Sequence, residues 1–187
     1  MPVVTGDMKQ INVTPLETER LILRMWEPDD FDAYANMCSD SEVMRFLTPD
    51  GKPMSRFDAW RSFSSHIGHW YLKGFGQFAV MERVSGDLVG RIGPWMPEGW
   101  PEFEIGWALR RKYWGRGYAT EAVKACITYS FAELGKLHLI SLIDPDNVRS
   151  IRVAERVGER LEGTVPRVSA PDKTILQYGL RRKDWPS

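Results

Sequence analysis

The sequence has 187 residues, of which 43% are hydrophobic and 27% are charged, and its 25 lysines and arginines balance 25 aspartates and glutamates. This composition suits one globular domain, and a formal net charge of zero argues against a protein that binds nucleic acid through a general basic excess. Two cysteines cannot form a disulfide framework, no apolar run is long enough to cross a bilayer, and the N-terminus lacks the layout of a signal peptide. We therefore expect a cytoplasmic protein that folds as a single domain over residues 1–187.

Hydrophobic periodicity and turn residues predict an α/β domain with strands of mixed direction. In chain order, the predicted elements are a polar lead-in open to partial disorder (1–17), a strand (18–26), a helix (27–38), a helix (55–74), two strands (75–84 and 88–95), a third strand (102–109), a helix (118–134), a strand (137–143), a helix (147–158) and a last strand (173–182). The "SGD" at 85–87 predicts a hairpin between the two strands that flank it. No repeat, low-complexity tract or linker divides the chain.

Local rules define the helix at 55–74 best. Ser55 and Asp58 have the spacing of a capping box, and Gly74 can end the helix. The residues predicted for its apolar face are Phe57, Trp60, Phe63, Ser64, Ile67, Trp70 and Tyr71. His66 and His69 have a spacing that a metal could use, but no cysteine or paired carboxylate completes such a site. We therefore expect both histidines on an exposed face, and no bound metal.

The segment "KYWGRGYATEA" at 112–122 places Gly115 and Gly117 on either side of Arg116, between a predicted strand and a predicted helix. It has no G-x-x-x-x-G-K-[ST] string of a P-loop, and Thr120 stands where a dinucleotide fingerprint needs a small residue. The free N–H groups of such a turn and the dipole of the next helix favour a pyrophosphate. The alternative is that the glycines only shape a tight turn between strand and helix.

The sequence "EIGWAL…YWGRGYATEA" at 104–122 closely resembles the acetyl-coenzyme-A binding segment of the GNAT acetyltransferase superfamily. Among the branches of this superfamily, its sequence most resembles the ribosomal-protein N-acetyltransferase (Rim-like) branch. The resemblance extends to "TERLILR" at 18–24 and "NVRSIRVAERVG" at 147–158, so it covers most of the chain. It implies an α/β fold with a mixed, mostly antiparallel central sheet, a splayed parallel pair of strands, and helices on both faces.

The resemblance also implies acetyl-coenzyme A as cosubstrate, with its pyrophosphate held by backbone amides at 112–117. The pantetheine arm is expected where the strands at 104–109 and 137–143 splay apart. The coenzyme-binding residues carried over by position are Leu109, Lys112, Trp114, Gly115, Arg116, Gly117, Tyr118, Ala119, Asn147 and Ser150. Lys112 replaces the usual glutamine or arginine, a mild departure because the contact is chiefly through the backbone. The neighbouring basic residues at 110–112 could add phosphate contacts.

Amide formation from a thioester requires a proton to leave an ammonium group and the leaving thiolate to be protonated. Glu104 matches the glutamate of this branch, which makes it the candidate base; a solvated carboxylate on a half-exposed strand is the alternative. Ser150 matches a serine that could protonate the sulfur, whereas Ala154 stands where many members carry a tyrosine acid. Asn147 could equally serve as a helix cap, and Ser150 could bond locally to the same turn.

Aromatic residues crowd the predicted loop at 93–102, where they are harder to bury than in a core. We therefore expect Trp95 and Trp100 to line the acceptor pocket, although core packing is the usual role of tryptophan. Period-two alternation places Glu102 on the same strand face as Glu104, where it could attract a cationic amine.

Together these features predict an N-acetyltransferase that moves the acetyl group of acetyl-coenzyme A directly to an amine in a ternary complex. The Rim-like resemblance implies a protein N-terminus as acceptor, and enzymes of similar spelling act on small amines and amino acids. A non-catalytic acyl-coenzyme-A-binding module is an alternative, and a nucleic-acid binder using the basic residues at 110–112 is a weaker one. We expect no direct nucleic-acid binding and no membrane partner, and leave a homodimer open.

Overall fold

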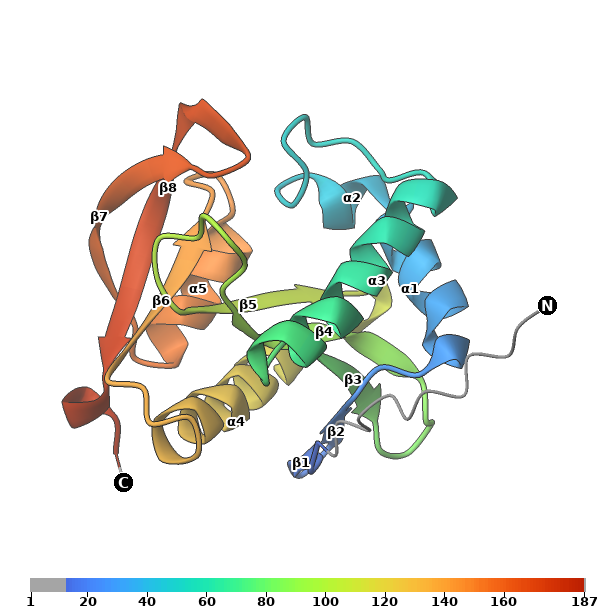
Figure 1. Ribbon diagram of the computed structural model, residues 1–187, viewed down its shortest axis with the longest axis horizontal. Coiled ribbons are helices and arrows are strands. Elements are labelled where there is room, and N and C mark those ends of the chain that lie inside the picture. Colours follow the sequence, from blue (N-terminus) through green and yellow to red (C-terminus); the bar gives the residue numbers. More distant parts are fainter. Residues whose placement is uncertain (1–12, 187) are drawn as a thin grey trace.

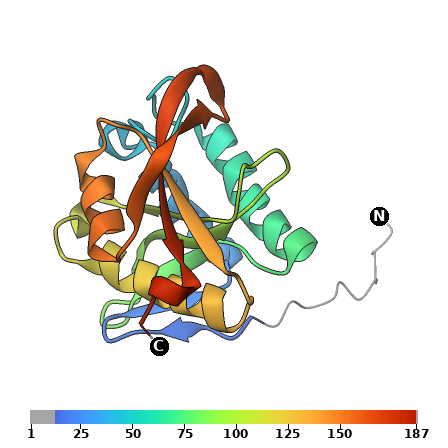
Figure 2. The ribbon, with the colours of Figure 1, turned by 90° about the vertical axis from the view of Figure 1, so that its left-hand side faces the viewer.

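The computed structural model describes residues 13–186 and confirms an α/β fold with helices on both faces of one sheet (Figures 1 and 2). The strands are β1 (Leu16–Glu17), β2 (Leu21–Arg24), β3 (Phe78–Glu82), β4 (Leu88–Trp95), β5 (Glu104–Leu109), β6 (His138–Ile143), β7 (Arg160–Arg167) and β8 (Ala170–Arg181). The helices are α1 (Phe31–Cys38), α2 (Ser41–Met44), α3 (Arg56–Lys73), α4 (Tyr118–Ala132) and α5 (Val148–Arg156). Short 3-10 helices are η1 (Pro28–Asp30), η2 (Arg111–Tyr113) and η3 (Arg182–Asp184). Most of the predicted lead-in, at 1–12, lies outside the described residues.

The eight strands form one sheet in the order β1-β2-β3-β4-β5-β6-β8-β7. Each neighbouring pair is antiparallel except β5 with β6, which is parallel. Figure 1 shows the sheet running from β1 and β2 near the bottom to β7 and β8 at the upper left. The hairpin between β3 and β4 forms as predicted, and Gly86 in its turn has a φ of 70°, which favours glycine.

Two hydrophobic clusters lie against the two faces of the sheet. Successive residues of a strand point to opposite faces, so Ala79 packs with α1 and α3 while its neighbour Val80 belongs to the cluster that contains α4. The apolar stripe predicted for α4 is buried, including Val123 and Ile127. A third cluster packs Ala154 of α5 against the far part of the sheet, where Figure 2 shows α5 beside the hairpin of β7 and β8.

Helix α3 forms where predicted, with the Ser55 side chain accepting from the Asp58 N–H at its start and Gly74 in the left-handed conformation at its end. Its predicted apolar face is wrong at Phe57, Trp60 and Tyr71, which are 70%, 53% and 47% exposed, and at Ser64, which is also exposed. The buried face instead runs through Ala59, Phe63, His66, His69 and Trp70. The prediction of two exposed histidines is therefore also wrong, since tertiary partners described below compensate for their burial.

Three elements were not expected from the sequence. The C-terminal end of the predicted lead-in forms β1, which pairs with β2, and the short helix α2 follows α1. Strand β7 has the sequence "RLEGTVPR" and is mostly exposed, so it has no apolar alternation to detect. Across residues 13–186 we find neither a helix long and apolar enough to span a membrane nor a group of His, Cys, Asp or Glu placed to hold a metal ion.

Candidate active site

The parallel strands β5 and β6 separate soon after they meet. In the part of the chain that the structure describes, their register holds a single pair, Glu104 with Ile140. A regular parallel ladder would continue with the Leu142 N–H donating to the Ile105 carbonyl. Instead, the Leu142 N–H lies 3.5 Å from Glu104 Oε1, and the Ile105 carbonyl accepts from Ser141 Oγ at 2.9 Å. Hydrogen bonds of side chains thus replace the backbone hydrogen bonds of the ladder at this point, and the two strands splay apart.

A cavity of about 170 Å³ opens at this splay. The residues predicted for the site that line it are Trp95, Trp100, Glu104, Asn147 and Ser150. Other lining residues were not singled out from the sequence, among them Phe46, Gln77, Arg91, Trp107, Ser141 and Arg167. The end of β4, strand β5 and the start of α5 thus bring the predicted base, the predicted sulfur contact and two predicted acceptor residues into one space.

Glu104 is an unusually placed carboxyl group, since its residue is only 8% exposed although it borders the cavity. Its Oε2 accepts a hydrogen bond from Trp100 Nε1 at 2.6 Å. Burial raises the pKa of Glu104 to about 7, while the hydrogen bond from Trp100 and the positive charge of Arg91 act in the opposite direction. A carboxyl group that titrates near neutrality can accept a proton at physiological pH and release it again.

Ser150 and Asn147 meet at the first turn of α5. Asn147 caps the helix, its Oδ1 accepting from the Ser150 N–H at 3.2 Å, so the capping interpretation is confirmed. The Ser150 hydroxyl points elsewhere, because Trp107 Nε1 donates to Ser150 Oγ at 3.2 Å. An indole N–H can only donate, so Ser150 Oγ is the acceptor and keeps its own proton for another partner.

The turn between β5 and α4 carries the two glycines. Gly115 and Gly117 have φ of 75° and 80°, in the left-handed region that disfavours other residues. Within residues 13–186 we find no hydrogen-bond acceptor for the N–H groups of Gly115, Arg116 and Gly117, and the first N–H groups of any helix lack partners inside it. A Cβ atom at Gly115 would meet no neighbouring atom, so the turn is open to solvent on that side.

The family model of the acetyltransferase (GNAT) domain matches residues 20–160. The chain belongs to the GNAT acetyltransferases. It is 32% identical over 148 residues to the uncharacterized N-acetyltransferase YnaD of Bacillus subtilis, covering 79% of this chain and 84% of that protein. The acetyltransferase from Agrobacterium tumefaciens superposes with a TM-score of 0.81 at 32% identity, over 91% of this chain and 96% of that one. The fold is also that of spermidine N-acetyltransferase from Vibrio cholerae, solved with CoA and spermine, with a TM-score of 0.71 at 16% identity over 89% and 98% of the two chains.

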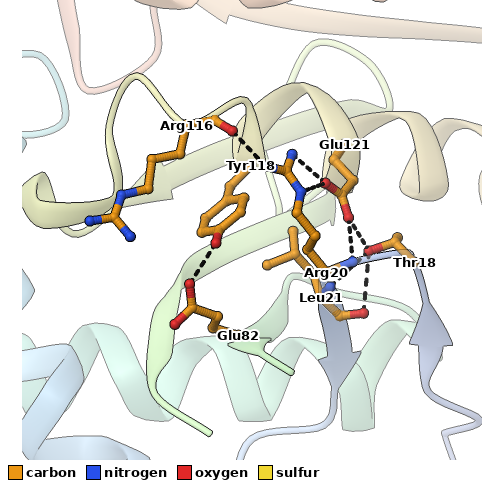
Figure 3. A network of polar contacts seen from close by, with 7 residues as sticks. All are labelled: Thr18, Arg20, Leu21, Glu82, Arg116, Tyr118 and Glu121. Carbon is orange, nitrogen blue, oxygen red and sulfur yellow. Dashed lines mark hydrogen bonds and ion pairs between the residues drawn. The ribbon is translucent and has the colours of Figure 1, made fainter. Parts of the chain in front are cut away.

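In this GNAT protein the segment between β1 and β2 forms a hydrogen-bond network with the glycine turn (Figure 3). The Arg20 side chain donates from Nη1 to the Arg116 carbonyl at 2.9 Å and from Nε to Glu121 Oε2 at 2.7 Å. Glu121, in the first turn of α4, also accepts from the Arg20 N–H and from the Thr18 hydroxyl. Because the Arg116 carbonyl accepts this hydrogen bond from Arg20, the orientation of the peptide group between Arg116 and Gly117 is fixed.

Tyr118 completes this network at the start of α4. Its hydroxyl donates to Glu82 Oε1 at 2.5 Å, and the Arg20 guanidinium lies 4.6 Å from the centre of its ring. Figure 3 shows Tyr118 beside Glu82 of β3 and Arg20, which lies just before β2. The segment "TERLILR", which carries part of the family resemblance, therefore contacts the glycine turn directly.

The other residues predicted to bind the coenzyme lie around the same turn and outside the cavity. Trp114 Nε1 donates to the Leu109 carbonyl at 2.9 Å, and the Arg149 guanidinium of α5 lies 4.5 Å from the Trp114 ring centre. Ala119 is partly buried against the core. The predicted set thus falls into two groups, one at the turn and one at the cavity, and α5 contributes to both.

The basic run before the turn is largely engaged in contacts within the protein. Arg110 donates to the Leu88 carbonyl, Arg111 pairs with Asp40 at 3.0 Å, and Lys112 pairs with Asp87 at 2.7 Å. Arg116 has no ion pair within 4.0 Å among the described residues, and its guanidinium lies 5.6 Å from the Tyr113 ring centre. Among these four, Arg116 is therefore the side chain best placed to meet an anion at the turn.

The structure places Glu102 apart from the cavity. Strand β5 begins at Glu104, two residues later than predicted, so Glu102 does not share its strand face. Its Oε2 lies 2.9 Å from His138 Nδ1, and Glu162 Oε1 lies the same distance from His138 Nε2. Glu102 is thus part of a surface cluster at the start of β6, although it follows Trp100 closely in sequence.

The two histidines of α3 support the wall of the cavity from behind. The His69 ring stacks on Trp95 at 4.5 Å, and the His66 ring lies 4.9 Å from it. His69 Nδ1 contacts the Phe75 carbonyl and Nε2 accepts from the Met96 N–H, which requires a neutral ring with the proton on Nδ1. Burial lowers the pKa of both histidines. The only signal in the sequence is their spacing on one helix, which does not reveal the burial.

Proposed function

We propose that this GNAT protein is an acetyl-coenzyme-A-dependent N-acetyltransferase of the Rim-like kind. The observation that carries the proposal is that Glu104, a buried carboxyl with a pKa of about 7, borders the same cavity as the Ser150 hydroxyl. One group is suited to accept a proton from an attacking amine, and the other is suited to donate a hydrogen bond to a leaving sulfur.

The glycine turn fits the pyrophosphate of the coenzyme. Its N–H groups have no partners among the described residues, its conformation requires glycine at two positions, and Arg116 adds a positive charge. Bound acetyl-coenzyme A would supply the acetyl thioester. The residues that would hold it are those at the glycine turn, together with Asn147 and Ser150 at the cavity.

The proposed chemistry has three steps that this chain's own residues assist. Glu104, in its ionised form, takes the proton of the acceptor's ammonium group, directly or through one water. The free amine nitrogen attacks the thioester carbonyl, a carbon–nitrogen bond forms and the carbon–sulfur bond breaks. Ser150, fixed by the hydrogen bond from Trp107, donates a hydrogen bond to the leaving sulfur. The second proton, which the nitrogen loses as the amide forms, goes to the thiolate, so that coenzyme A leaves as a thiol.

The acceptor is proposed to approach between Trp95 and Trp100. The resemblance to the Rim-like branch supports a protein N-terminus. One contact favours a small amine or amino acid instead: Arg167, from the β7–β8 hairpin, donates to the Phe46 and Thr48 carbonyls at 2.9 Å and 3.1 Å. Because Phe46 and Arg167 both line the cavity, this bridge crosses one of its sides, and a peptide entering there has to displace it.

Calorimetric titration with acetyl-coenzyme A, beside a Gly117→Trp variant, tests the coenzyme site. At a φ of 80° a tryptophan is strained, so we expect binding by the parent chain and its loss in the variant. Acetyl transfer is then measured on a panel of peptides with free N-termini, polyamines and amino acids. Coenzyme binding without transfer to any acceptor favours the non-catalytic module, and an absence of binding refutes the proposal.

A further inference from the structure

Glu159 is a buried carboxyl group that the proposed mechanism does not use. It is the residue between Gly158, which follows α5, and the first residue of β7, and it is only 3% exposed. Its Oε1 lies 2.9 Å from Ser141 Oγ, behind the splay of β5 and β6. Its Oε2 is fully buried and has no hydrogen-bond partner among the described residues.

The two contacts of Ser141 limit where the proton of Glu159 can lie. Ser141 Oγ is 2.9 Å from the Ile105 carbonyl and 2.9 Å from Glu159 Oε1. A hydroxyl has one proton, and a carbonyl oxygen can only accept. If Ser141 donates to Ile105, the short contact with Glu159 is a hydrogen bond only when the carboxyl donates. The three groups then form one chain, in which Glu159 donates to Ser141 and Ser141 donates to the Ile105 carbonyl.

The surroundings of Glu159 agree with a neutral acid. An ionised carboxylate would leave a charged oxygen buried without a partner, which is costly, whereas an unpaired carbonyl oxygen costs less. The charged groups that act on it are Glu104 on β5 and Glu162 on β7, and both are acidic. Burial, aided by these two charges, raises the pKa of Glu159 to about 8, although the hydrogen bond that Ser141 can donate to the ionised carboxylate acts in the opposite direction.

We propose that Glu159, as a protonated acid, is a positioning residue that fixes the splay of β5 and β6 through Ser141 and thereby orients Glu104. The Ile105 carbonyl, which accepts the hydrogen bond from Ser141, belongs to the residue next to Glu104 on β5. Next to Ser141 on β6, the Leu142 N–H faces Glu104 Oε1 at 3.5 Å. The chain from Glu159 therefore fixes both backbone segments that hold the base. This inference rests on the proposed function, because it assigns Glu159 a part in that reaction.

Loss of the proton changes the chain in a defined way. The Ser141 hydroxyl then donates to the Glu159 carboxylate, the Ile105 carbonyl loses its partner, and a second negative charge is placed behind Glu104. The hydrogen bond that joins β5 to β6 at the start of the splay is then lost, and Glu104, the base, moves from its productive position. Acetyl transfer should therefore fall as the pH rises through about 8, while the fall at low pH belongs to Glu104.

Three variants test the proposal through the pH profile of kcat/KM on the acceptor found for the parent chain. Glu159→Gln keeps a donor for Ser141 but cannot ionise, so the fall at high pH should disappear. Glu159→Ala removes the donor and should lower kcat/KM by about 10- to 100-fold at pH 7, as expected for a misplaced catalytic group. Glu155→Gln changes an exposed glutamate of α5 and should keep the parent profile. A Glu159→Gln profile that still falls above pH 8, or an Ala variant as active as the parent, overturns the proposal.

A second measurement separates this inference from the proposed function. A buried neutral acid makes the folded state lose stability as the pH rises from 4.5 to about 8, so the melting temperature of Glu159→Gln should depend less on pH than that of the parent. If the melting temperatures of Glu159→Gln and the parent vary in the same way with pH, Glu159 is not protonated in the folded state, whether or not acetyl transfer is detected. If no acceptor is acetylated, the proposed function has failed, yet these curves still decide the state of Glu159.

Discussion

Replacing Glu104 by glutamine should make the protein more stable and less active. Burial that raises the pKa of Glu104 from 4.5 to about 7 costs about 3 kcal/mol of folding free energy once the carboxyl is ionised, at about 1.4 kcal/mol for each pH unit. The pKa of Glu104 is higher in the folded than in the unfolded state. The parent protein is therefore most stable with respect to this group below pH 4.5, where the carboxyl is neutral, and it loses that stability as the pH rises through 7. Glutamine can still accept from Trp100 and has no charge to bury.

The stability advantage of Glu104→Gln over the parent should therefore grow by about 3 kcal/mol between pH 4.5 and pH 8. For a chain of this size that corresponds to a difference in melting temperature of about 6–12 °C. Acetyl transfer at pH 8 should fall by about 10²- to 10⁴-fold, the usual contribution of a general base. Thermal unfolding at a series of pH values and initial rates with saturating acetyl-coenzyme A measure the two effects.

Glu98→Gln is the matched control, because Glu98 is an exposed glutamate of the loop that precedes β5. It should change neither the shape of the stability curve nor the rate. If the curves of Glu104→Gln and the parent run parallel, Glu104 is not a buried acid with a raised pKa. If Glu104→Gln transfers acetyl groups at the parent rate, Glu104 is not the base, whatever its effect on stability.

Three further predictions concern residues around the coenzyme and the base. Arg20→Ala removes the donor to the carbonyl of Arg116, so acetyl-coenzyme A should bind about 10-fold more weakly by calorimetry while the acceptor KM changes little; equal losses for both ligands would contradict a role at the turn. Trp100→Phe deletes a hydrogen bond that lowers the pKa of Glu104, so the low-pH limb of kcat/KM should move to higher pH; an unmoved limb would mean that another group titrates. Ser150→Ala should lower kcat about 10-fold or more and weaken coenzyme binding much less, because most contacts with the coenzyme are at the turn; an unaltered kcat would exclude Ser150 from the sulfur.

The parts of the fold that could be predicted from the sequence are those with local causes. The cap at Ser55 and the end at Gly74 are set by residues within one turn of each helix end, so α3 was placed to within a residue. The glycine turn was equally predictable, because the φ values of Gly115 and Gly117 are ones that other residues rarely adopt. Strand β7 was missed because its pairing with β8 is set by backbone hydrogen bonds, not by an apolar pattern.

The parts of the site that could not be predicted depend on distant partners. His66 reads as polar in sequence, yet Tyr34 and Trp95, which lie 32 and 29 positions away, enclose it. Glu102 and Glu104 are near neighbours in sequence, but only one faces the cavity because the strand begins between them and the surface cluster at His138 holds the other. Periodicity gives the face of a residue only when the bounds of its element are known.

The two buried glutamates of this site illustrate how one residue type acquires two roles from its surroundings. Glu104 opens onto the cavity and receives donors from Trp100 and Leu142, which favour its ionised form. Glu159 does not border the cavity, and its side chain has one hydrogen-bond partner among the described residues, Ser141. Because Ser141 already has an acceptor at Ile105, the neutral form of Glu159 is favoured. Burial raises the pKa of both carboxyl groups, so Glu104 becomes ionised as the pH passes its raised pKa, and Glu159 stays neutral until the pH passes its own. The burial that makes Glu104 a usable base therefore also moves the low-pH limit of acetyl transfer upward, towards neutrality.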